Sequence, residues 1–294
     1  MTKLALGTAQ FGLDYGVSNA GGRVDAESVD RILGLAARHN LEILDTAQGY
    51  GDSQAVLGRA LPRDHEFRIV TKTPGWLGKP PKDAGQRVID ALEESRRLLN
   101  NPDRLSLLAH HADDLVAAGG DDIVAALHEL KRIGQIDALG VSVYDRRQID
   151  AVMELFKPDI VQIPLNLFDQ RLIADGTLEE LRRRDIEVHV RSCFLQGLIL
   201  MPEKALPETL KAAAPAIKRL VAFTLEHGMS RLQAAISYLH SLSGIDHIII
   251  GVTRAAELAE IIAAFNNSPH PDLPWASLAM DDENILDPTN WRLQ

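Results

Sequence analysis

Eight short apolar runs, spaced along almost the whole chain, constrain the fold of this sequence more than any other feature. Most of them are continuously apolar instead of alternating, which is typical of parallel strands covered on both faces. The eight runs predict strands at residues 4–6, 41–45, 67–72, 105–110, 138–142, 160–164, 186–192 and 245–251. Segments with helical spacing of apolar residues separate them, at 25–39, 83–99, 122–133, 146–156, 178–184, 231–241 and 255–265, with an additional helix at 214–227.

Strands that alternate with helices in this way predict an α/β fold, a single closed (β/α)8 TIM barrel. The alternative, a doubly wound sheet, binds a nucleotide through a Gly-x-Gly-x-x-Gly turn. Gly49 and Gly51 begin such a turn, but Gln54 stands at its third glycine position. Because no linker divides the chain, we expect residues 1–265 to form the barrel. Residues 266–294, rich in Pro, Asn and Asp, are expected to form an irregular tail packed on it.

Composition and charge exclude several classes of partner. The 294 residues contain 31 Lys and Arg against 41 Asp and Glu, a net charge of −10, which argues against nucleic acid or an anionic membrane as the main partner. The single cysteine, Cys193, excludes an internal disulfide and a cysteine-based zinc site. Without a long apolar run or a signal-peptide core, the chain is expected to be cytoplasmic. The oligomeric state is not predicted.

Reactive side chains are expected at the C-terminal ends of barrel strands. Those ends carry Asp45, Lys72, His110 and Ser142, and Tyr50 follows the second strand by a short loop. Each residue alone fits an ordinary structural role, but together they form a proton-transfer group. A lysine cation stabilises phenolate and so lowers the pKa of a tyrosine, while a carboxylate holds the lysine and an imidazole orients a substrate oxygen. Such a site would stabilise an alkoxide forming on a carbonyl carbon as hydride arrives.

The adjacent His110 and His111 do not suggest a metal site. Neighbouring residues on one strand face opposite sides, so both imidazoles could not bind the same ion. We therefore expect no metal.

These residues resemble the aldo-keto reductases, which use NADPH or NADH on a (β/α)8 barrel. The similarity is strongest in DTAQGYGDSQAVLGRAL at 45–61. It also covers LGTAQFG (6–12), VTK (70–72), LLAHHADDL (107–115), LGVSVY (139–144), VQIPLNLFDQR (161–171), VRSCFLQGLIL (190–200) and IIIGVTRAAELAEI (248–261). The resemblance implies that Tyr50 is the general acid, with Lys72, Asp45 and His110 as its partners. In the family a histidine closes the apolar strand before an acidic loop, which selects His110 over His111.

The resemblance also implies a cofactor site. Ser142 and Gln162 match positions that hydrogen-bond the nicotinamide carboxamide, although Val143 replaces the asparagine that often follows the serine. The loop that holds the pyrophosphate is matched by Ser192, Leu195, Gln196 and Gly197, and Gly7 and Thr8 are expected under the reacting centre.

The sequence departs from the family pattern at two further places, the end of the seventh strand and the turn after the eighth. Arg191 stands where many members place an aromatic residue; its guanidinium could stack, bind phosphate or form a structural salt bridge. Gly251, Thr253 and Arg254 match the turn that receives the adenosine 2′-phosphate, which favours NADPH over NADH even though Ile261 replaces a family asparagine.

Aromatic residues in the loops are candidates for the substrate wall. Trp76, Phe11 and Tyr144 are assigned to it, with Tyr15 as an alternative to Phe11. Cys193 has no activating neighbour in the sequence, so we expect it to pack as a small core residue.

The sequence thus predicts NADPH-dependent reduction of an aldehyde or ketone, with sugar-related carbonyls as one option, to an alcohol. NADH is the second choice of cofactor, and the partner is a small carbonyl substrate. One alternative is a cofactor-binding regulatory or redox-sensing subunit on the same barrel. A second is an aldolase that forms a Schiff base on Lys72. The natural substrate and the physiological direction are not predicted.

Overall fold

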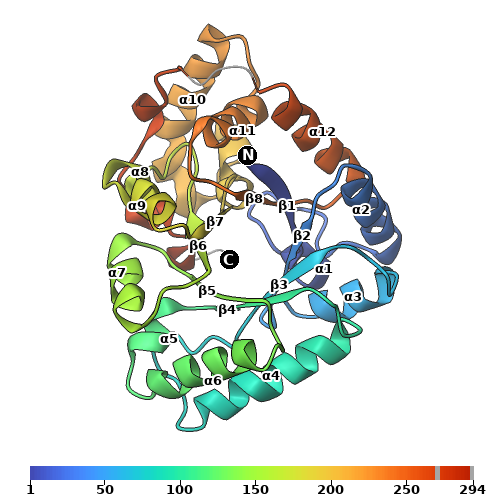
Figure 1. Cartoon of the computed structure of the whole chain (residues 1–294). Coiled ribbons are helices and arrows are strands. Elements are labelled where there is room, and N and C mark those ends of the chain that lie inside the picture. The colour runs from blue at the N-terminus through green and yellow to red at the C-terminus, as the bar shows by residue number, and fades with distance from the viewer. Residues whose placement is uncertain (269–271, 292–294) are drawn as a thin grey trace.

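A closed parallel barrel forms the centre of the molecule (Figure 1). The structure is a computed structural model that describes residues 1–268 and 272–291, and within these ranges eight strands pair in chain order, β8 closing on β1. The strands are β1 (Lys3–Gly7), β2 (Ile43–Asp45), β3 (Arg68–Lys72), β4 (Leu105–Ala109), β5 (Ala138–Ser142), β6 (Ile160–Pro164), β7 (Glu187–Arg191) and β8 (His247–Gly251). Every predicted strand is present with small shifts at its ends, and the (β/α)8 fold is confirmed.

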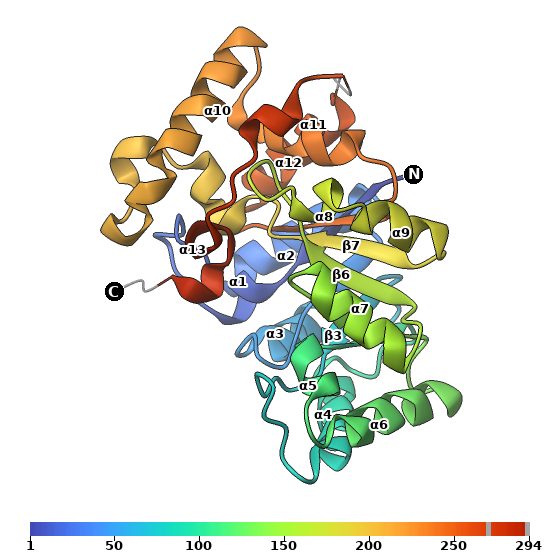
Figure 2. The same cartoon turned by 90° about the vertical axis from the view of Figure 1, so that its left-hand side faces the viewer.

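Helices surround the barrel (Figure 1). The outer helices are α2 (Ala26–Arg38), α3 (Ser53–Ala60), α4 (Ala84–Leu98), α6 (Gly120–Arg132), α7 (Arg146–Leu155), α9 (Thr177–Arg183), α11 (Arg231–Ser241) and α12 (Ala255–Asn266). Shorter helices α1 (Ala9–Gly12), α5 (Ala112–Val116) and α8 (Arg171–Ala174) lie in the loops, and α10 (Ala214–Glu226) projects to one side (Figure 2). None of the described helices is long and apolar enough to span a bilayer.

One helix of the ring, α3, was not predicted, whereas the additional helix predicted at 214–227 is present as α10 between β7 and α11. The reason lies in the buried face of α3, which is polar. Ser53 Oγ donates to the Thr8 carbonyl at 2.8 Å, and the amide of Gln54 donates to Thr71 Oγ1 at 2.8 Å. An apolar stripe of helical period is therefore missing from this segment.

The barrel interior is built in layers, and the layers place the candidate site. Its middle layer is apolar and consists of Ala5, Ile43, Val70, Leu108, Ile160 and Ile249. Because strand residues alternate between faces, the residue two positions further along each strand also points inward, one layer nearer the C-terminal end. That upper layer contains Gly7, Asp45, Lys72, His110, Gln162 and Gly251, joined by Ser142 from β5 and Arg191 from β7.

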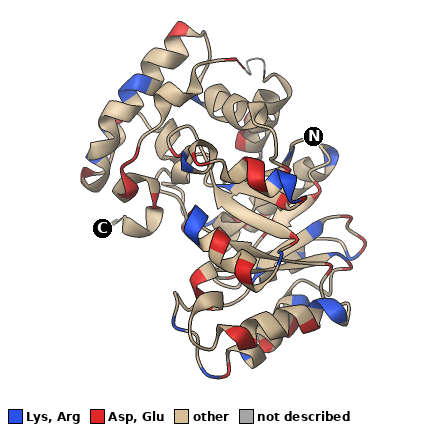
Figure 3. Cartoon of the chain, turned by 60° about the vertical axis from the view of Figure 1, so that its left-hand side comes forward, with Lys and Arg blue, Asp and Glu red and all other residues tan. Residues whose placement is uncertain are grey.

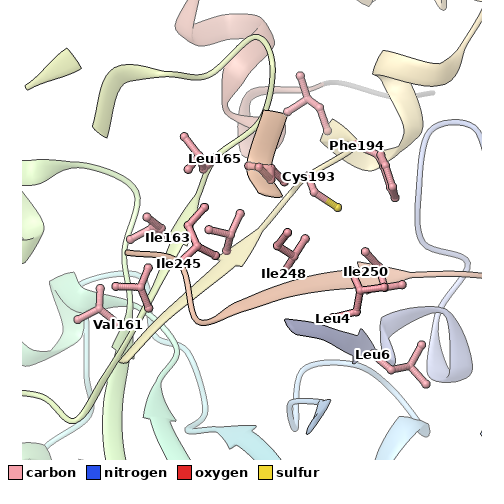
Figure 4. Close-up of a cluster of buried hydrophobic side chains, with 14 of the residues drawn as sticks. Leu4, Leu6, Val161, Ile163, Leu165, Cys193, Phe194, Ile245, Ile248 and Ile250 are labelled. Carbon is pink, nitrogen blue, oxygen red and sulfur yellow. The ribbon is translucent and has the colours of Figure 1, made fainter. Parts of the chain in front are cut away.

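The intervening residues face outward into the core between barrel and helices. Figure 4 shows Leu4 and Leu6 of β1 with Ile248 and Ile250 of β8 in this outer hydrophobic cluster. All four side chains are almost fully buried. The alternation therefore separates a packing face from a chemical face on the same strands.

The chain after α12 packs along the barrel. Trp275 is buried with its ring 5.2 Å from Phe223, and the Met280 N–H donates to the Phe168 carbonyl at 2.9 Å. Short helical turns occur at Trp275–Leu278, Glu283–Leu286 and Pro288–Asn290. The domain boundary at residue 265 stays a prediction, and residues 269–271 and 292–294 of the expected tail lie outside the described residues.

Candidate active site

A cavity of about 890 Å³ opens at the C-terminal ends of the strands. Its volume lies in the range of small-molecule and cofactor sites. Asp45, Tyr50, Lys72 and His110, the four expected catalytic residues, all line it. The structure thus brings together residues that are as many as 65 positions apart in the chain.

A buried ion pair forms the floor of this group. Lys72 Nζ lies 2.7 Å from Asp45 Oδ1 and donates to the Thr46 carbonyl at 3.1 Å, while Gln162 donates to Asp45 Oδ2 at 2.8 Å. Burial lowers the pKa of Lys72, but the attraction of Asp45 and the neighbouring Tyr50 outweighs it, so the pKa lies above its usual value. A buried pair is tolerated when its hydrogen bonds are satisfied in this way. Lys72 is therefore held as an ammonium group.

Tyr50 lies beside this pair, with Lys72 Nζ 5.1 Å from the centre of its ring. Burial raises the pKa of Tyr50, and Lys72 opposes the rise without reversing it. The sequence predicted that Lys72 lowers the pKa of Tyr50 below its usual value. Lys72 does act in that direction, but desolvation of the buried phenol has the larger effect. The phenol is consequently protonated at neutral pH.

The position of Tyr50 depends on a glycine in the preceding loop. A Cβ atom on Gly12 of α1 would overlap the Tyr50 carbonyl oxygen and the Ser53 amide nitrogen. Only glycine lets α1 approach the Tyr50 loop this closely. This contact fixes the loop that carries the phenol.

The two histidines are separated by their surroundings. His110 lines the cavity, with its ring 6.1 Å from that of Tyr50, whereas His111 packs against Gly75 outside the lining. Their rings stack 4.7 Å apart instead of facing opposite sides, because β4 ends at Ala109. Burial and the nearby Lys72 lower the pKa of His110 to about 3. Its imidazole is therefore neutral and can donate one hydrogen bond.

The two residues expected to bind the nicotinamide carboxamide lie next to the Lys72–Asp45 pair. Ser142 and Gln162 are neighbours on β5 and β6, and since the Gln162 nitrogen is used by Asp45, its oxygen is free to accept. Among the described residues, the Ser142 hydroxyl makes no hydrogen bond. The NH2 group of a carboxamide could donate to the Gln162 oxygen, and its carbonyl could accept from the Ser142 hydroxyl. Gly7 and Thr8 line the cavity beside them.

The loop after β7, which is expected to hold the pyrophosphate, contains several residues with a left-handed backbone conformation. Ser192, Leu195, Gln196 and Gly197 have positive φ values of 59°, 48°, 53° and 91°. The Leu195 and Gly197 N–H groups already donate to the Ser192 and Phe194 carbonyls, at 2.8 and 2.9 Å, so phosphate oxygens would have to bind other N–H groups of the loop. Of the four, Leu195 is fully buried and does not line the cavity, which departs from its expected contact. The other three line it.

The loop after β1 covers this region, a part of the site that the sequence did not predict. A Cβ atom on Gly197 would overlap Ser18 Oγ, so the two loops touch. Ser18, Asn19 and Arg23 line the cavity together with several glycines of the same loop. The Gly-rich composition of 16–22, in the loop that follows the first strand, was the available signal.

Arg191 and Arg254 lie in different electrostatic surroundings. The Arg191 guanidinium stacks 4.3 Å from the centre of the Tyr144 ring and donates to the Val143 carbonyl at 3.1 Å. Arg254 is paired with Glu257 at 2.7 Å, and Glu257 also accepts from the Thr253 N–H at 2.7 Å. The arginine expected to receive a 2′-phosphate thus already has a carboxylate partner.

The expected substrate wall is only partly correct. Tyr144 and Tyr15 line the cavity, whereas Phe11 is fully buried and Trp76 lies outside the lining. Phe11 belongs to the inner face of α1, which packs into the core. Trp76 packs against the hydrophobic core, and Asp114 holds its backbone, accepting from the Trp76 N–H at 2.9 Å.

Cys193 is a packing residue at the edge of the cavity. It is buried among Leu165, Phe194 and Ile248 (Figure 4). Burial raises the pKa of its thiol to about 12, so no thiolate forms near neutral pH. This environment agrees with the expectation from sequence.

A second polar cluster, not predicted, lies at the opposite end of the barrel. Possible ligand atoms of Glu187, His189 and His247 lie within 4.8 Å of one another. Arg68 of β3 already binds this carboxylate, with Nη1 3.0 Å from Glu187 Oε2. Burial raises the pKa of Glu187, but hydrogen bonds from the histidines and Arg68 outweigh it and hold that pKa well below its usual range. With its charge balanced by Arg68, the cluster joins three strands of the barrel floor.

The barrel, the buried lysine–aspartate pair and the adjacent tyrosine define the class of protein. The model of the Aldo/keto reductase family matches residues 3–279. The chain belongs to this family.

Individual relatives are distant. The chain is 28% identical over 223 residues to the NADH-specific methylglyoxal reductase of Escherichia coli (strain K12), a match that covers 68% of this chain and 65% of that protein. It is 24% identical over 313 residues to the L-glyceraldehyde 3-phosphate reductase of the same strain, covering 94% of this chain and 89% of the relative.

Solved structures share the fold. The aldo-keto reductase AKR11C1 from Bacillus halodurans in its holo form superposes with a TM-score of 0.74 at 20% identity, covering 94% of this chain and 92% of the other. The glycerol dehydrogenase AKR11B4 from Gluconobacter oxydans gives 0.72 at 22% identity, covering 94% and 90%.

Proposed function

We propose that this protein reduces a small aldehyde or ketone to an alcohol, with a nicotinamide dinucleotide in the cavity and Tyr50 as the general acid. The observation that carries the proposal is the convergence of Tyr50, His110 and the Lys72–Asp45 pair at one end of the cavity. The loop after β7 lies at the same end of the barrel. Two relatives act on aldehydes by their names, which supports this substrate class.

Each of the four residues has a separate role in the transfer of the proton to the substrate oxygen. The bound nicotinamide would supply hydride to the carbonyl carbon. Neutral His110 donates a hydrogen bond to the carbonyl oxygen, and the protonated phenol of Tyr50 then gives that oxygen its proton. Lys72 stabilises the phenolate that remains, and Asp45 keeps the ammonium in place.

We propose NADH as the preferred cofactor, in place of the NADPH predicted from Arg254. Glu257 and Glu260 both line the cavity at the Arg254 turn, and Glu257 neutralises Arg254. A 2′-phosphate would meet two carboxylates there, whereas a ribose hydroxyl can donate to one. The relative named as NADH-specific supports this choice.

Fluorescence titration with NADH and NADPH in parallel tests the proposal. We expect both to bind, with NADH tighter by about tenfold or more, the ratio that 1.4 kcal/mol gives. Glu257→Gln, which frees Arg254, should move the preference toward NADPH. Glu179→Gln breaks a comparable exposed i,i+3 pair with Arg182 and should leave both constants unchanged. No binding of either dinucleotide would refute the function, and tighter NADPH binding by the wild type would refute the cofactor assignment.

The Schiff-base aldolase is disfavoured by the state of Lys72. Nucleophilic attack needs a neutral amine, but the pair with Asp45 keeps the pKa of Lys72 high. Borohydride should therefore trap no adduct on Lys72 in the presence of a carbonyl compound. A regulatory subunit would bind NADH tightly and reduce no carbonyl, an outcome that the titration and a turnover assay distinguish together.

A further inference from the structure

The cavity contains one cationic side chain without an ionic partner. Among the described residues, four Lys or Arg side chains line it, and three are paired: Lys72 with Asp45, Arg23 with Asp52 and Arg254 with Glu257. For Arg191, no carboxylate oxygen lies within 4.0 Å of the guanidinium in residues 1–268 and 272–291. The structural salt bridge that the sequence allowed for Arg191 is therefore not formed with any described residue.

The guanidinium of Arg191 is also short of hydrogen-bond acceptors. It donates to the Val143 carbonyl at 3.1 Å and to Ser192 Oγ at 3.3 Å, both uncharged. Its Nε is buried and makes no hydrogen bond to any described residue. Because the group has five N–H donors in a rigid fork and the described residues accept from only two of them, it keeps donors for a carboxylate or phosphate in the cavity that it lines.

The side chain is held in a fixed direction. It crosses from the end of β7 to the end of β5, where it binds the Val143 carbonyl and stacks on the Tyr144 ring. This direction leads toward the Tyr50 and His110 side of the cavity, and its charge is felt there, since Arg191 contributes to lowering the pKa of His110. The guanidinium is therefore directed from β7 toward the ends of β5 and its neighbour β4, which leads to His110, and away from the adjacent β8 and the Arg254 turn.

We propose that Arg191 binds an anionic group of the substrate, so that the substrate class is a carbonyl compound carrying a carboxylate or a phosphate. The anion would lie against the guanidinium where it lines the cavity, and the carbonyl against Tyr50 and His110. An ion pair of this kind, shielded from water, is stronger than one on the surface. This inference rests on the proposed function, but its central test does not require turnover.

Calorimetric titration tests the binding step directly. Succinate, oxalate and inorganic phosphate are titrated separately into the wild-type chain, with and without saturating NADH. At least one should bind, and Arg191→Gln should weaken that binding by about tenfold to a hundredfold, as loss of a charge-assisted hydrogen bond predicts. Arg147→Gln, at a side chain that is 82% exposed on α7, is the matched control and should bind as the wild type does.

The same variants distinguish the source of the anion. If Arg191 holds the cofactor phosphates instead, Arg191→Gln will weaken NADH binding by tenfold or more and leave the binding of succinate and oxalate to the NADH-saturated chain unchanged, which overturns the proposal. No anion binding by the wild type, or equal binding by Arg191→Gln, also overturns it. If Arg191→Gln does not fold, Arg191→Lys decides: the fork geometry predicts weaker anion binding than wild type, and equal binding contradicts it.

A kinetic comparison extends the test to substrates. Succinic semialdehyde should have a higher kcat/KM than butanal, which has the same chain length without a carboxylate, and Arg191→Lys should reduce that ratio. An equal kcat/KM for the two aldehydes in the wild type would contradict the assigned substrate class. Absence of turnover on both, with anion binding still dependent on Arg191, would refute the reductase function alone and leave the anion site standing.

Discussion

The phenol of Tyr50 is under two opposing influences. Burial raises its pKa and Lys72 lowers it, and burial is the larger. For reduction this balance is useful, because the acid must keep its proton until negative charge develops on the substrate oxygen. Lys72, held as a cation by Asp45, then stabilises the phenolate at the moment it forms.

This balance predicts the pH dependence of reduction. A proton donor whose pKa is raised stays protonated until the pH passes that pKa, so kcat/KM should be constant up to about pH 10, the ordinary pKa of tyrosine. His110, with a pKa of about 3, should add no acid limb above pH 6. A pH profile of kcat/KM at saturating NADH measures this. A decline centred between pH 7 and 8 would contradict the assignment of Tyr50.

Most site residues could be predicted because they occupy the ends of strands. The inward-facing upper layer follows from strand periodicity and barrel closure alone, as for Asp45, Lys72 and Gln162. Phe11 and Trp76 were placed wrongly because the direction of a loop side chain depends on tertiary contacts. The pairing of Arg254 with Glu257 could not be predicted for the same reason.

At the scale of elements, the loops after β1 and β7 meet at the part of the cavity where we propose that the cofactor binds. Gly197 has a φ of 91°, and a Cβ atom there would overlap Ser18 of the opposite loop. The close approach, and not only the positive φ, requires glycine at this position.

Gly197→Ala should therefore weaken NADH binding by about tenfold, since the loops must separate by part of a bond length. Gly134→Ala is the matched control: φ is also positive, at 73°, but no heavy atom of the described residues lies within 4 Å of its Cβ position. It should destabilise the fold similarly and leave the NADH dissociation constant unchanged. Fluorescence titration and thermal melting of both variants, and of Gly197→Ala with Ser18→Gly, measure this. Equal effects of the two alanines on NADH binding would refute the loop contact.

The helix α3 shows that a helix can form without the periodic apolar residues by which helices are predicted from sequence. Its buried side carries Ser53 and Gln54, and Gly58 is required because a Cβ atom would overlap the Leu98 carbonyl. Hydrogen bonds and close backbone packing replace an apolar stripe here. Helices with an apolar stripe, such as α2 and α7, were predicted almost to their ends.

At the scale of the whole molecule, the net charge of −10 does not describe the cavity. Acidic and basic residues are interspersed over the outer helices in Figure 3, and many form exposed i,i+3 or i,i+4 pairs that contribute little to stability. Inside the cavity the Lys and Arg side chains are paired one by one, except that Arg191 has no carboxylate partner among the described residues, and the lining carboxylates of Asp25 and Glu260 have no cationic partner there either. The local field at the reacting centre is thus set by individual residues.

The central claim is that Tyr50 gives its proton to a carbonyl oxygen in a barrel that binds NADH. Oxidation of NADH by butanal or succinic semialdehyde, followed for the wild type and Tyr50→Phe, tests it most directly. The structure predicts that Tyr50→Phe binds NADH as the wild type does, while kcat falls by about a hundredfold or more, the contribution of a positioned general acid. A Tyr50→Phe variant that turns over at close to the wild-type rate would contradict the account.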